Sequence, residues 1–371
     1  MKRRDLFVFA GQSNMMGAAV LPPVLPIDTK DSYEYKHKAK RLGASEGDFV
    51  LAGYPCGEFS YADDAFKTAY LPENADENGN SILNKYSANT YFCPAMCNLK
   101  DREKHEQQPF DTFSEATYIK GPTLAPLFAD EWEKKGQSCA YAHIAKGAVG
   151  IFHYFNENMI DEYLRRAAEY NETHTEKIPL TVQKMPIRLG ASAYFDKKTS
   201  DFFADAKNRF AGEDMSNKIF VWCQGEGNNQ MTPDNYKLCM EILWEHVKTL
   251  GFTHFFCVRV GNWPVSGDMC NVMKAQERFC DENPNCYIIT RAMSFMPNPG
   301  TDKDGWFTEE PAEEYQNCRD SCLGFVNPHI NEKGFATIAK HMADNTARLL
   351  CEGKEPVLEK EIVAKMINTE C

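Results

Sequence analysis

The chain has 371 residues, of which 43% are hydrophobic and 25% are charged, and its formal net charge is −12. Such a composition is ordinary for a globular protein, and the length is sufficient for a large core. The negative charge disfavours a nucleic-acid partner and an anionic membrane surface, and every apolar run is far shorter than the ~20 residues of a membrane span.

The first predicted element is a short apolar run at residues 5–10, which is typical of a buried β-strand. Gly11-Gln12-Ser13-Asn14-Met15-Met16-Gly17 follows directly, and its glycines favour a tight turn. A serine in this turn lies at the rim of a sheet, where backbone N–H groups and a helix dipole can stabilise an oxyanion. Ser13 is therefore either a candidate nucleophile or the N-cap of the next element.

Strand-like and helix-like segments alternate along the rest of the chain, apart from two long stretches. Further strands are predicted at 139–145, 218–223, 254–260 and 286–290, and helices at 124–135, 197–211, 233–249, 271–283 and 332–351. This alternation predicts an α/β fold, a three-layer α/β/α sandwich around a five-stranded parallel, flavodoxin-like sheet.

Two of these predicted strands end in glycine-containing turns that carry polar side chains. The strand 139–145 runs into a turn with Gly147, and the strand 218–223 runs into Gln224-Gly225-Glu226-Gly227-Asn228. Ligands of open parallel sheets bind outside the carboxyl ends of the strands. These two turns and the Ser13 turn are therefore expected to line one crevice.

The alternation is interrupted by two segments, 18–118 and 152–195, which we interpret as insertions in a single domain over residues 1–353, followed by a tail at 354–371. A structureless loop of about 100 residues is uncommon inside a compact domain, so 18–118 is expected to form a folded subdomain or lid. Its aromatic residues either stack on sugar rings or form a small core of their own. The segment 152–195 is expected to form another wall of the crevice.

A histidine that can activate Ser13 lies near the other end of the chain. Asn327-Pro328-His329 precedes the predicted helix 332–351, so His329 is expected in a loop just before that helix. A serine nucleophile needs a general base, and histidine is the usual one. The alternative for His329 is an ordinary surface histidine.

Together these blocks resemble SGNH hydrolases, and most of all the sialate O-acetylesterase-like branch that includes acetylxylan esterases of carbohydrate esterase family six. The resemblance rests on Gly11-Gln12-Ser13-Asn14-Met15, Gly121-Pro122, Gly147, Trp222-Cys223-Gln224-Gly225-Glu226, Ala275-Gln276 and His329 in this order. It covers residues 5–17, 119–151, 215–290 and 323–350, and leaves the two insertions outside.

The resemblance implies a role for each matching residue. It assigns Ser13 as nucleophile and His329 as base, with the N–H groups of Ser13 and Gly147 as oxyanion donors. A side-chain amide is the third donor, and Gln224 is the first choice with Asn228 as the alternative. Gln12, Asn14 and His153 are predicted to bind substrate.

The sequence departs from the family pattern three residues before the histidine. The family carries Asp there to orient the imidazole, whereas this chain has Val326. Glu226 is our first candidate for the missing carboxylate. A Ser-His dyad oriented by a backbone carbonyl is the second account, and loss of activity is the third.

The predicted function is removal of O-acetyl groups from a carbohydrate by a serine esterase, without metal or organic cofactor. Two alternatives stay open: an esterase for a small non-sugar ester, and a catalytically silent carbohydrate-binding module on the same scaffold. The apolar run after Met1-Lys2-Arg3-Arg4 is too short for a signal peptide, which predicts a cytoplasmic protein. The 14 cysteines are accordingly expected to be reduced thiols, and the oligomeric state stays open.

Overall fold

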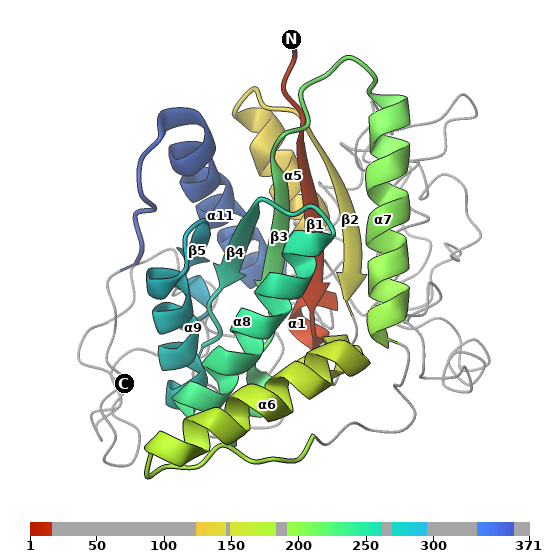
Figure 1. Ribbon diagram of the computed structural model, residues 1–371. Coiled ribbons are helices and arrows are strands. Elements are labelled where there is room, and N and C mark those ends of the chain that lie inside the picture. Colours follow the sequence, from red (N-terminus) through yellow and green to blue (C-terminus); the bar gives the residue numbers. More distant parts are fainter. Residues whose placement is uncertain (17–123, 146–148, 183–190, 262–268, 295–331, 360–371) are drawn as a thin grey trace, which may run out of the picture.

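The computed structural model describes residues 1–16, 124–145, 149–182, 191–261, 269–294 and 332–359 (Figure 1). A five-stranded parallel sheet with the strand order β2-β1-β3-β4-β5 forms its centre. This order is the flavodoxin-like one, so the predicted fold class is confirmed. The strands are β1 (Asp5–Gly11), β2 (Cys139–Ala145), β3 (Lys218–Cys223), β4 (His254–Val258) and β5 (Cys286–Thr290).

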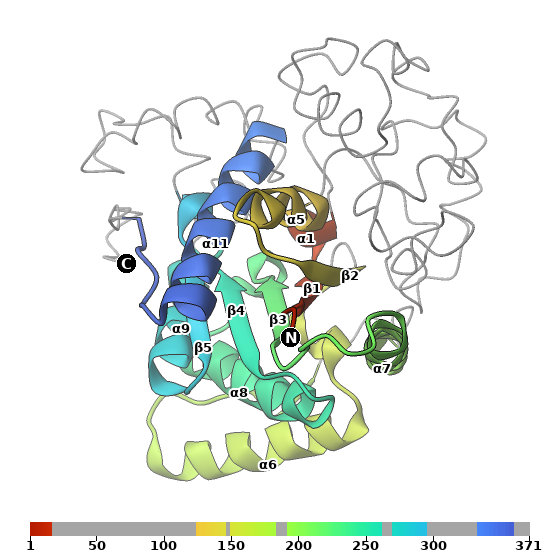
Figure 2. The same cartoon turned by 90° about the horizontal axis from the view of Figure 1, so that it is seen from above.

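Helices cover both faces of this sheet. One face carries α5 (Leu124–Lys134) and α11 (Glu332–Glu352), and the other carries α7 (Ala191–Arg209), α8 (Pro233–Thr249) and α9 (Cys270–Glu282) (Figure 2). Each predicted helix therefore exists, with boundaries that shift by a few residues. Both faces are covered, so the strands are largely apolar, and every residue of β1 is buried, including its polar first residue Asp5.

One long helix, α6 (Glu157–Thr173), was not among the predicted elements and lies within the segment interpreted as an insertion. Asn156 caps its first turn by accepting a hydrogen bond from the Met159 N–H at 3.0 Å. Its buried residues Met159, Tyr163 and Ala167 are spaced by four and form one face, and α6 packs against α8. At least this part of 152–195 is therefore an additional helical layer on the scaffold.

The carboxyl ends of β1, β2 and β3 lie at one level. Gly11, the last residue of β1, is in register with Ala145 of β2 and with Cys223 of β3. These three strands therefore end at the same edge of the sheet, as predicted from the sequence. Short elements occur at this edge, namely α1 (Ser13–Met16), η4 (Ile151–Tyr154) and η6 (Glu226–Asn228).

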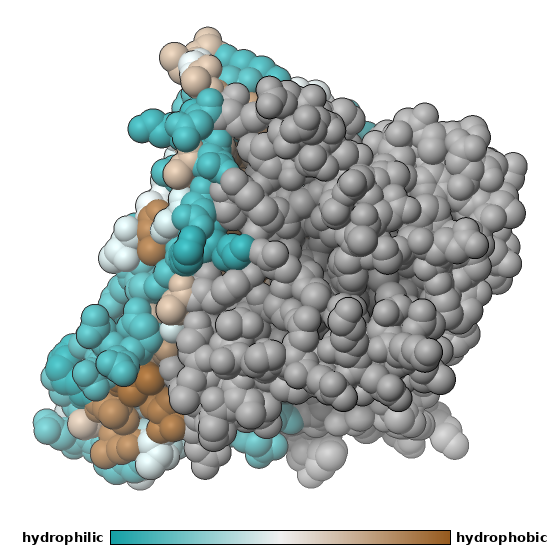
Figure 3. Space-filling view, turned by 90° about the vertical axis from the view of Figure 1, so that its right-hand side faces the viewer, coloured by the Kyte–Doolittle hydropathy of each residue, from teal (hydrophilic) through white to brown (hydrophobic). Residues whose placement is uncertain are grey.

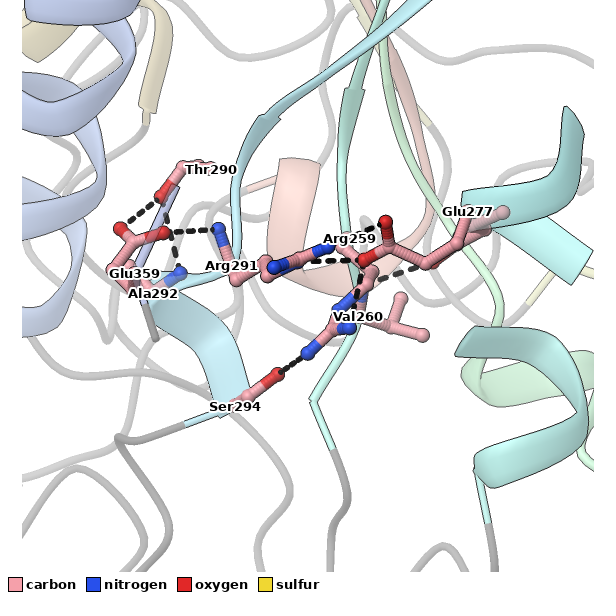
Figure 4. Close-up of polar contacts among 9 residues, drawn as sticks. Arg259, Val260, Glu277, Thr290, Arg291, Ala292, Ser294 and Glu359 are labelled. Carbon is pink, nitrogen blue, oxygen red and sulfur yellow. Dashed lines mark hydrogen bonds and ion pairs between the residues drawn. The ribbon is translucent and has the colours of Figure 1, made fainter. Parts of the chain in front are cut away.

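A charged cluster ties the ends of β4 and β5 to the start of the C-terminal tail (Figure 4). Glu277 of α9 accepts hydrogen bonds from Arg259 at 2.7 Å and from Arg291 at 2.7 and 2.8 Å. Glu359 accepts hydrogen bonds from the Thr290 hydroxyl and the Arg291 N–H, both at 2.7 Å. The tail is therefore attached at the same edge of the sheet that carries the predicted crevice.

Seven of the described cysteines are free thiols, all buried except Cys351, whereas Cys270 is disulfide-bonded. The prediction of reduced thiols is therefore wrong for Cys270. None of the helices in the described ranges combines the length and hydrophobicity that crossing a membrane requires. On the face drawn in Figure 3, the described residues are mainly hydrophilic, with a small hydrophobic area near the lower end.

Candidate active site

Ser13 is the first residue of α1 and comes two residues after the end of β1, at the rim predicted from the sequence. Its side chain is half-buried. Gly11 makes this turn possible, because its φ of +149° is unfavourable for other residues and a Cβ there would lie 2.0 Å from the Cys223 carbonyl oxygen. The Gln12 N–H donates to the same Cys223 oxygen at 3.1 Å, which fixes the turn against β3.

The two residues that flank Ser13 both bind the turn that follows β3. Gln12 Oε1 accepts a hydrogen bond from the Gly227 N–H at 3.1 Å, and Asn14 donates to Glu226 Oε1 at 2.6 Å. Both side chains are buried. Ser13 is therefore held next to the turn that carries Glu226, and the predicted contact of Gln12 and Asn14 with substrate stays a prediction.

The Glu226 carboxylate is enclosed at this edge although the residue as a whole is half-buried. Burial raises its pKa, and the hydrogen bond from Asn14 opposes this rise. The second oxygen, Oε2, is buried and has no hydrogen-bond partner among the residues that the structure describes. A buried carboxylate oxygen of this kind is able to accept a further donor.

Gln224 lies at the centre of the polar contacts below the turn. Its Nε2 lies 3.0 Å from Gln12 Oε1, 3.2 Å from the Val149 oxygen and 2.6 Å from Asn228 Oδ1. Its Oε1 accepts a hydrogen bond from the Tyr236 hydroxyl at 2.7 Å. The Gln224 side chain is fully buried. Its amide contacts residues that follow β1, β2 and β3, and it thereby connects the ends of these three strands.

The two ends of the Asn228 amide are bound unequally: the oxygen has strong partners, and the nitrogen has a weak one. Oδ1 accepts from the Ile151 N–H at 3.0 Å as well as from Gln224, whereas the acceptor of Nδ2 among the described residues is the Met231 sulfur at 3.5 Å. A thioether is a weak acceptor. Gly150 passes close to this amide, since a Cβ there would lie 3.3 Å from Nδ2.

His153 is buried in η4, where its Nδ1 lies 3.1 Å from both the N–H and the carbonyl oxygen of Gly150. Its predicted contact with substrate stays a prediction. Gly147, His329 and the segment 18–118 lie outside the described residues. The structure therefore brings together Ser13, Glu226, Gln224 and Asn228 among the predicted site residues.

Three side chains that support this site were not assigned a role from the sequence. Tyr236 binds Gln224, and Gln276 of α9 donates to the Gln224 carbonyl oxygen at 2.9 Å while accepting from the Val260 N–H at 3.1 Å. Tyr154 of η4 binds the backbone of Gly11. Gln276 belongs to the Ala275-Gln276 block that carries the family resemblance, which is a signal although no role was drawn from it. For Tyr236 and Tyr154 the sequence contains only the polar residue type as a signal.

Fold and site define an α/β protein with a flavodoxin-like sheet and a serine–carboxylate–amide cluster at the carboxyl ends of β1 and β3. No protein-family model matches the sequence, and no curated protein matches it. Within the described ranges, no group of three or more His, Cys, Asp or Glu side chains is arranged to hold a metal ion.

Among the solved structures that resemble the chain are two that share 12% sequence identity with it. One is a protein from Arabidopsis thaliana, with a TM-score of 0.41 over 94% of this chain and 100% of that chain. The other is a carbohydrate acetylesterase from Xanthomonas citri, with a TM-score of 0.42 over 94% of this chain and 57% of that chain.

Proposed function

We propose that this protein is a serine esterase of the SGNH type that removes O-acetyl groups from a carbohydrate. The observation that carries the proposal is a pair of hydrogen bonds between the residues on either side of Ser13 and the Glu226–Asn228 turn: Gln12 accepts from the Gly227 N–H, and Asn14 donates to Glu226. They hold a candidate nucleophile beside a buried carboxylate and a side-chain amide. These are the groups that acyl transfer by a serine needs besides a base.

In the proposed reaction, Ser13 Oγ attacks the ester carbonyl carbon while His329 takes the hydroxyl proton. The negative charge forms on the carbonyl oxygen, where the N–H groups of Ser13 and Gly147 stabilise it. His329 then gives the proton to the departing alcohol. A water molecule, deprotonated by His329, attacks the carbonyl carbon of the acetyl-serine, the bond to Ser13 Oγ breaks, acetate leaves and Ser13 Oγ takes the proton back. The carbohydrate specificity and the branch with sialate O-acetylesterases and acetylxylan esterases rest on the sequence resemblance alone.

For the third oxyanion donor we propose Asn228 in place of our first choice, Gln224. Three protein acceptors surround the Gln224 amide nitrogen, and turning it toward a substrate would break these contacts. Asn228 Nδ2 would give up only the weak contact with Met231. Glu226 Oε2, in this proposal, accepts the Nδ1 proton of His329 and replaces the Asp that is missing at position 326.

The decisive experiment compares hydrolysis of p-nitrophenyl acetate by the wild type and by Ser13→Ala, with p-nitrophenyl butyrate and acetylated sugars as further substrates. We expect acetate hydrolysis to fall to background in the variant, because the acyl-enzyme cannot form. Thermal unfolding of both proteins checks that the variant is folded. A folded wild type without activity on any of these esters would favour the carbohydrate-binding module instead.

A further inference from the structure

Tyr154 touches the nucleophile turn from a distant part of the sequence. Its hydroxyl accepts a hydrogen bond from the Gly11 N–H at 2.9 Å and donates to the Gly11 carbonyl oxygen at 2.7 Å. In a parallel sheet, the N–H and C=O of one residue face the same neighbouring strand. The hydroxyl therefore satisfies both backbone groups of Gly11 at the point where the ladder ends.

The tyrosine ring is fixed by its surroundings, so the hydroxyl has a defined position. Tyr154 is 1% exposed, and its ring packs edge-on against Trp222 of β3 at 4.9 Å and against Phe195 of α7 at 5.7 Å. Phe195 and Trp222 are themselves buried. Through the Tyr154 ring, the contact with the Gly11 backbone is therefore fixed by packing against β3 and α7.

The short helix that carries Tyr154 is also bound to the proposed oxyanion amide. The N–H of Ile151, at the start of η4, donates to Asn228 Oδ1 at 3.0 Å, and the Val149 oxygen accepts from Gln224 Nε2 at 3.2 Å. One four-residue helix thus binds the nucleophile turn at its end and the amide turn at its start. A shift of η4 would move Ser13 relative to Asn228.

We infer that Tyr154 is a positioning residue for the esterase reaction, because its hydroxyl fixes the Gly11 backbone and thereby the N–H and Oγ of Ser13 relative to the Asn228 amide. This inference rests on the proposed function. The Tyr154 hydroxyl binds the backbone of Gly11, two residues before Ser13, so it acts on the nucleophile through Gly11. A nucleophile displaced by about 1 Å can lose about 100-fold in rate.

The test compares Tyr154→Phe with Tyr163→Phe. Tyr163 is equally buried, and its hydroxyl also lies within hydrogen-bond distance of two oxygens, that of Pro179 at 3.0 Å and Asn235 Oδ1 at 2.9 Å, away from the nucleophile turn. We expect Tyr154→Phe to lower kcat for p-nitrophenyl acetate about 10- to 100-fold with little change in KM. Tyr163→Phe should keep kcat, even if its thermal stability falls by the same amount. Active sites are counted with a fluorophosphonate probe, so that an unfolded fraction does not imitate a lower kcat.

A second measurement tests the contact between Tyr154 and the Gly11 backbone and does not depend on enzymatic activity. Hydrogen–deuterium exchange at the Gly11 amide should accelerate in Tyr154→Phe and not in Tyr163→Phe, because only the first variant removes its acceptor. An active wild type whose Tyr154→Phe variant keeps kcat, or loses no more than Tyr163→Phe, would overturn the positioning role alone. A wild type that is inactive and unlabelled by the probe would overturn the proposed function, and the positioning role with it.

Discussion

At the scale of single residues, the buried polar side chains of the site form hydrogen bonds with one another. Gln224 connects Gln12, Asn228 and the Val149 backbone, and Asn14 binds Glu226. Buried polar groups of this kind are costly unless each is paired. The Glu226 Oε2 atom, which lacks a partner among the described residues, is therefore the oxygen we assign to an additional donor.

The first prediction concerns Glu226→Gln. Burial raises the pKa of Glu226, so the ionised carboxylate lowers the stability of the folded state once the pH rises above the unfolded value of about 4.3. The variant should lose about 10²- to 10⁴-fold in kcat, as loss of an orienting carboxylate does, without losing stability at pH 7.5. Initial rates with p-nitrophenyl acetate and thermal unfolding at pH 7.5 and pH 4 measure both effects.

The stability difference between wild type and Glu226→Gln should shift in favour of the wild type toward pH 4, where its carboxyl group is protonated. Glu172→Gln, which alters an exposed carboxylate on α6, is the matched control and should leave kcat unchanged. Full activity of Glu226→Gln would support the dyad oriented by a backbone carbonyl.

At the scale of elements, the junction of β1, β3 and α1 sets where Ser13 lies. Gly11, the last residue of β1, can lie close to the Cys223 carbonyl oxygen because it has no side chain. Tyr154 of η4 binds the backbone of the same residue. The turn is therefore specified by contacts with β3 and η4 together with its own sequence.

We accordingly predict that Gly11→Ala destabilises the protein by about 3 kcal/mol or more, because the new methyl group would overlap the Cys223 oxygen and force β1 away from β3. Gly136→Ala is the control, since Gly136 also has a positive φ, +73°, but has open space where a Cβ would be. It should cost only about 1–2 kcal/mol of backbone strain. Urea unfolding of both variants measures the difference, and equal losses would contradict the steric account.

At the scale of the whole molecule, the Glu359 carboxylate connects the C-terminal tail with the end of β5 and with α11. Glu359 binds Thr290 and the Arg291 N–H, and its Oε1 lies 2.7 Å from His341 Nδ1 of α11. Burial opposes ionisation of Glu359, but the hydrogen bonds from His341 and Arg291 outweigh it and lower its pKa to about 2. The ionised group therefore stabilises the folded state above the unfolded pKa.

We predict that Glu359→Gln lowers the free energy of unfolding by about 1–3 kcal/mol at pH 7. A lowered pKa gives stabilisation that is present above about pH 4.3 and is lost as the pH falls toward about 2. The gap between variant and wild type should therefore close over this range in urea titrations at several pH values. Glu352→Gln, which alters an exposed carboxylate in the same region, should change little, and a gap that is constant with pH would contradict the assignment.

Much of the scaffold was predictable because local patterns determine it. Each of the five strands is a buried apolar run bounded by polar or turn residues, and a parallel sheet requires the helices that connect them. Helix α6 was missed although its Asn156 cap and its buried residues at a spacing of four were visible in the sequence, because the segment was assigned to an insertion. The choice of Ser13 and of the turn after β3 likewise followed from their position at strand ends.

The sequence by itself determined the sheet, its flanking helices and the edge at which polar residues gather, since these depend on hydrophobic periodicity and on right-handed strand connections. Only the tertiary structure decided which polar groups meet there. It placed Tyr154 on Gly11, Gln12 and Asn14 on the Glu226–Asn228 turn, and Glu359 on His341. The partners in these contacts are separated by between 18 and 215 residues in the sequence. A contact between residues so far apart in the sequence depends on the packing of the whole chain, and a local sequence pattern does not predict it.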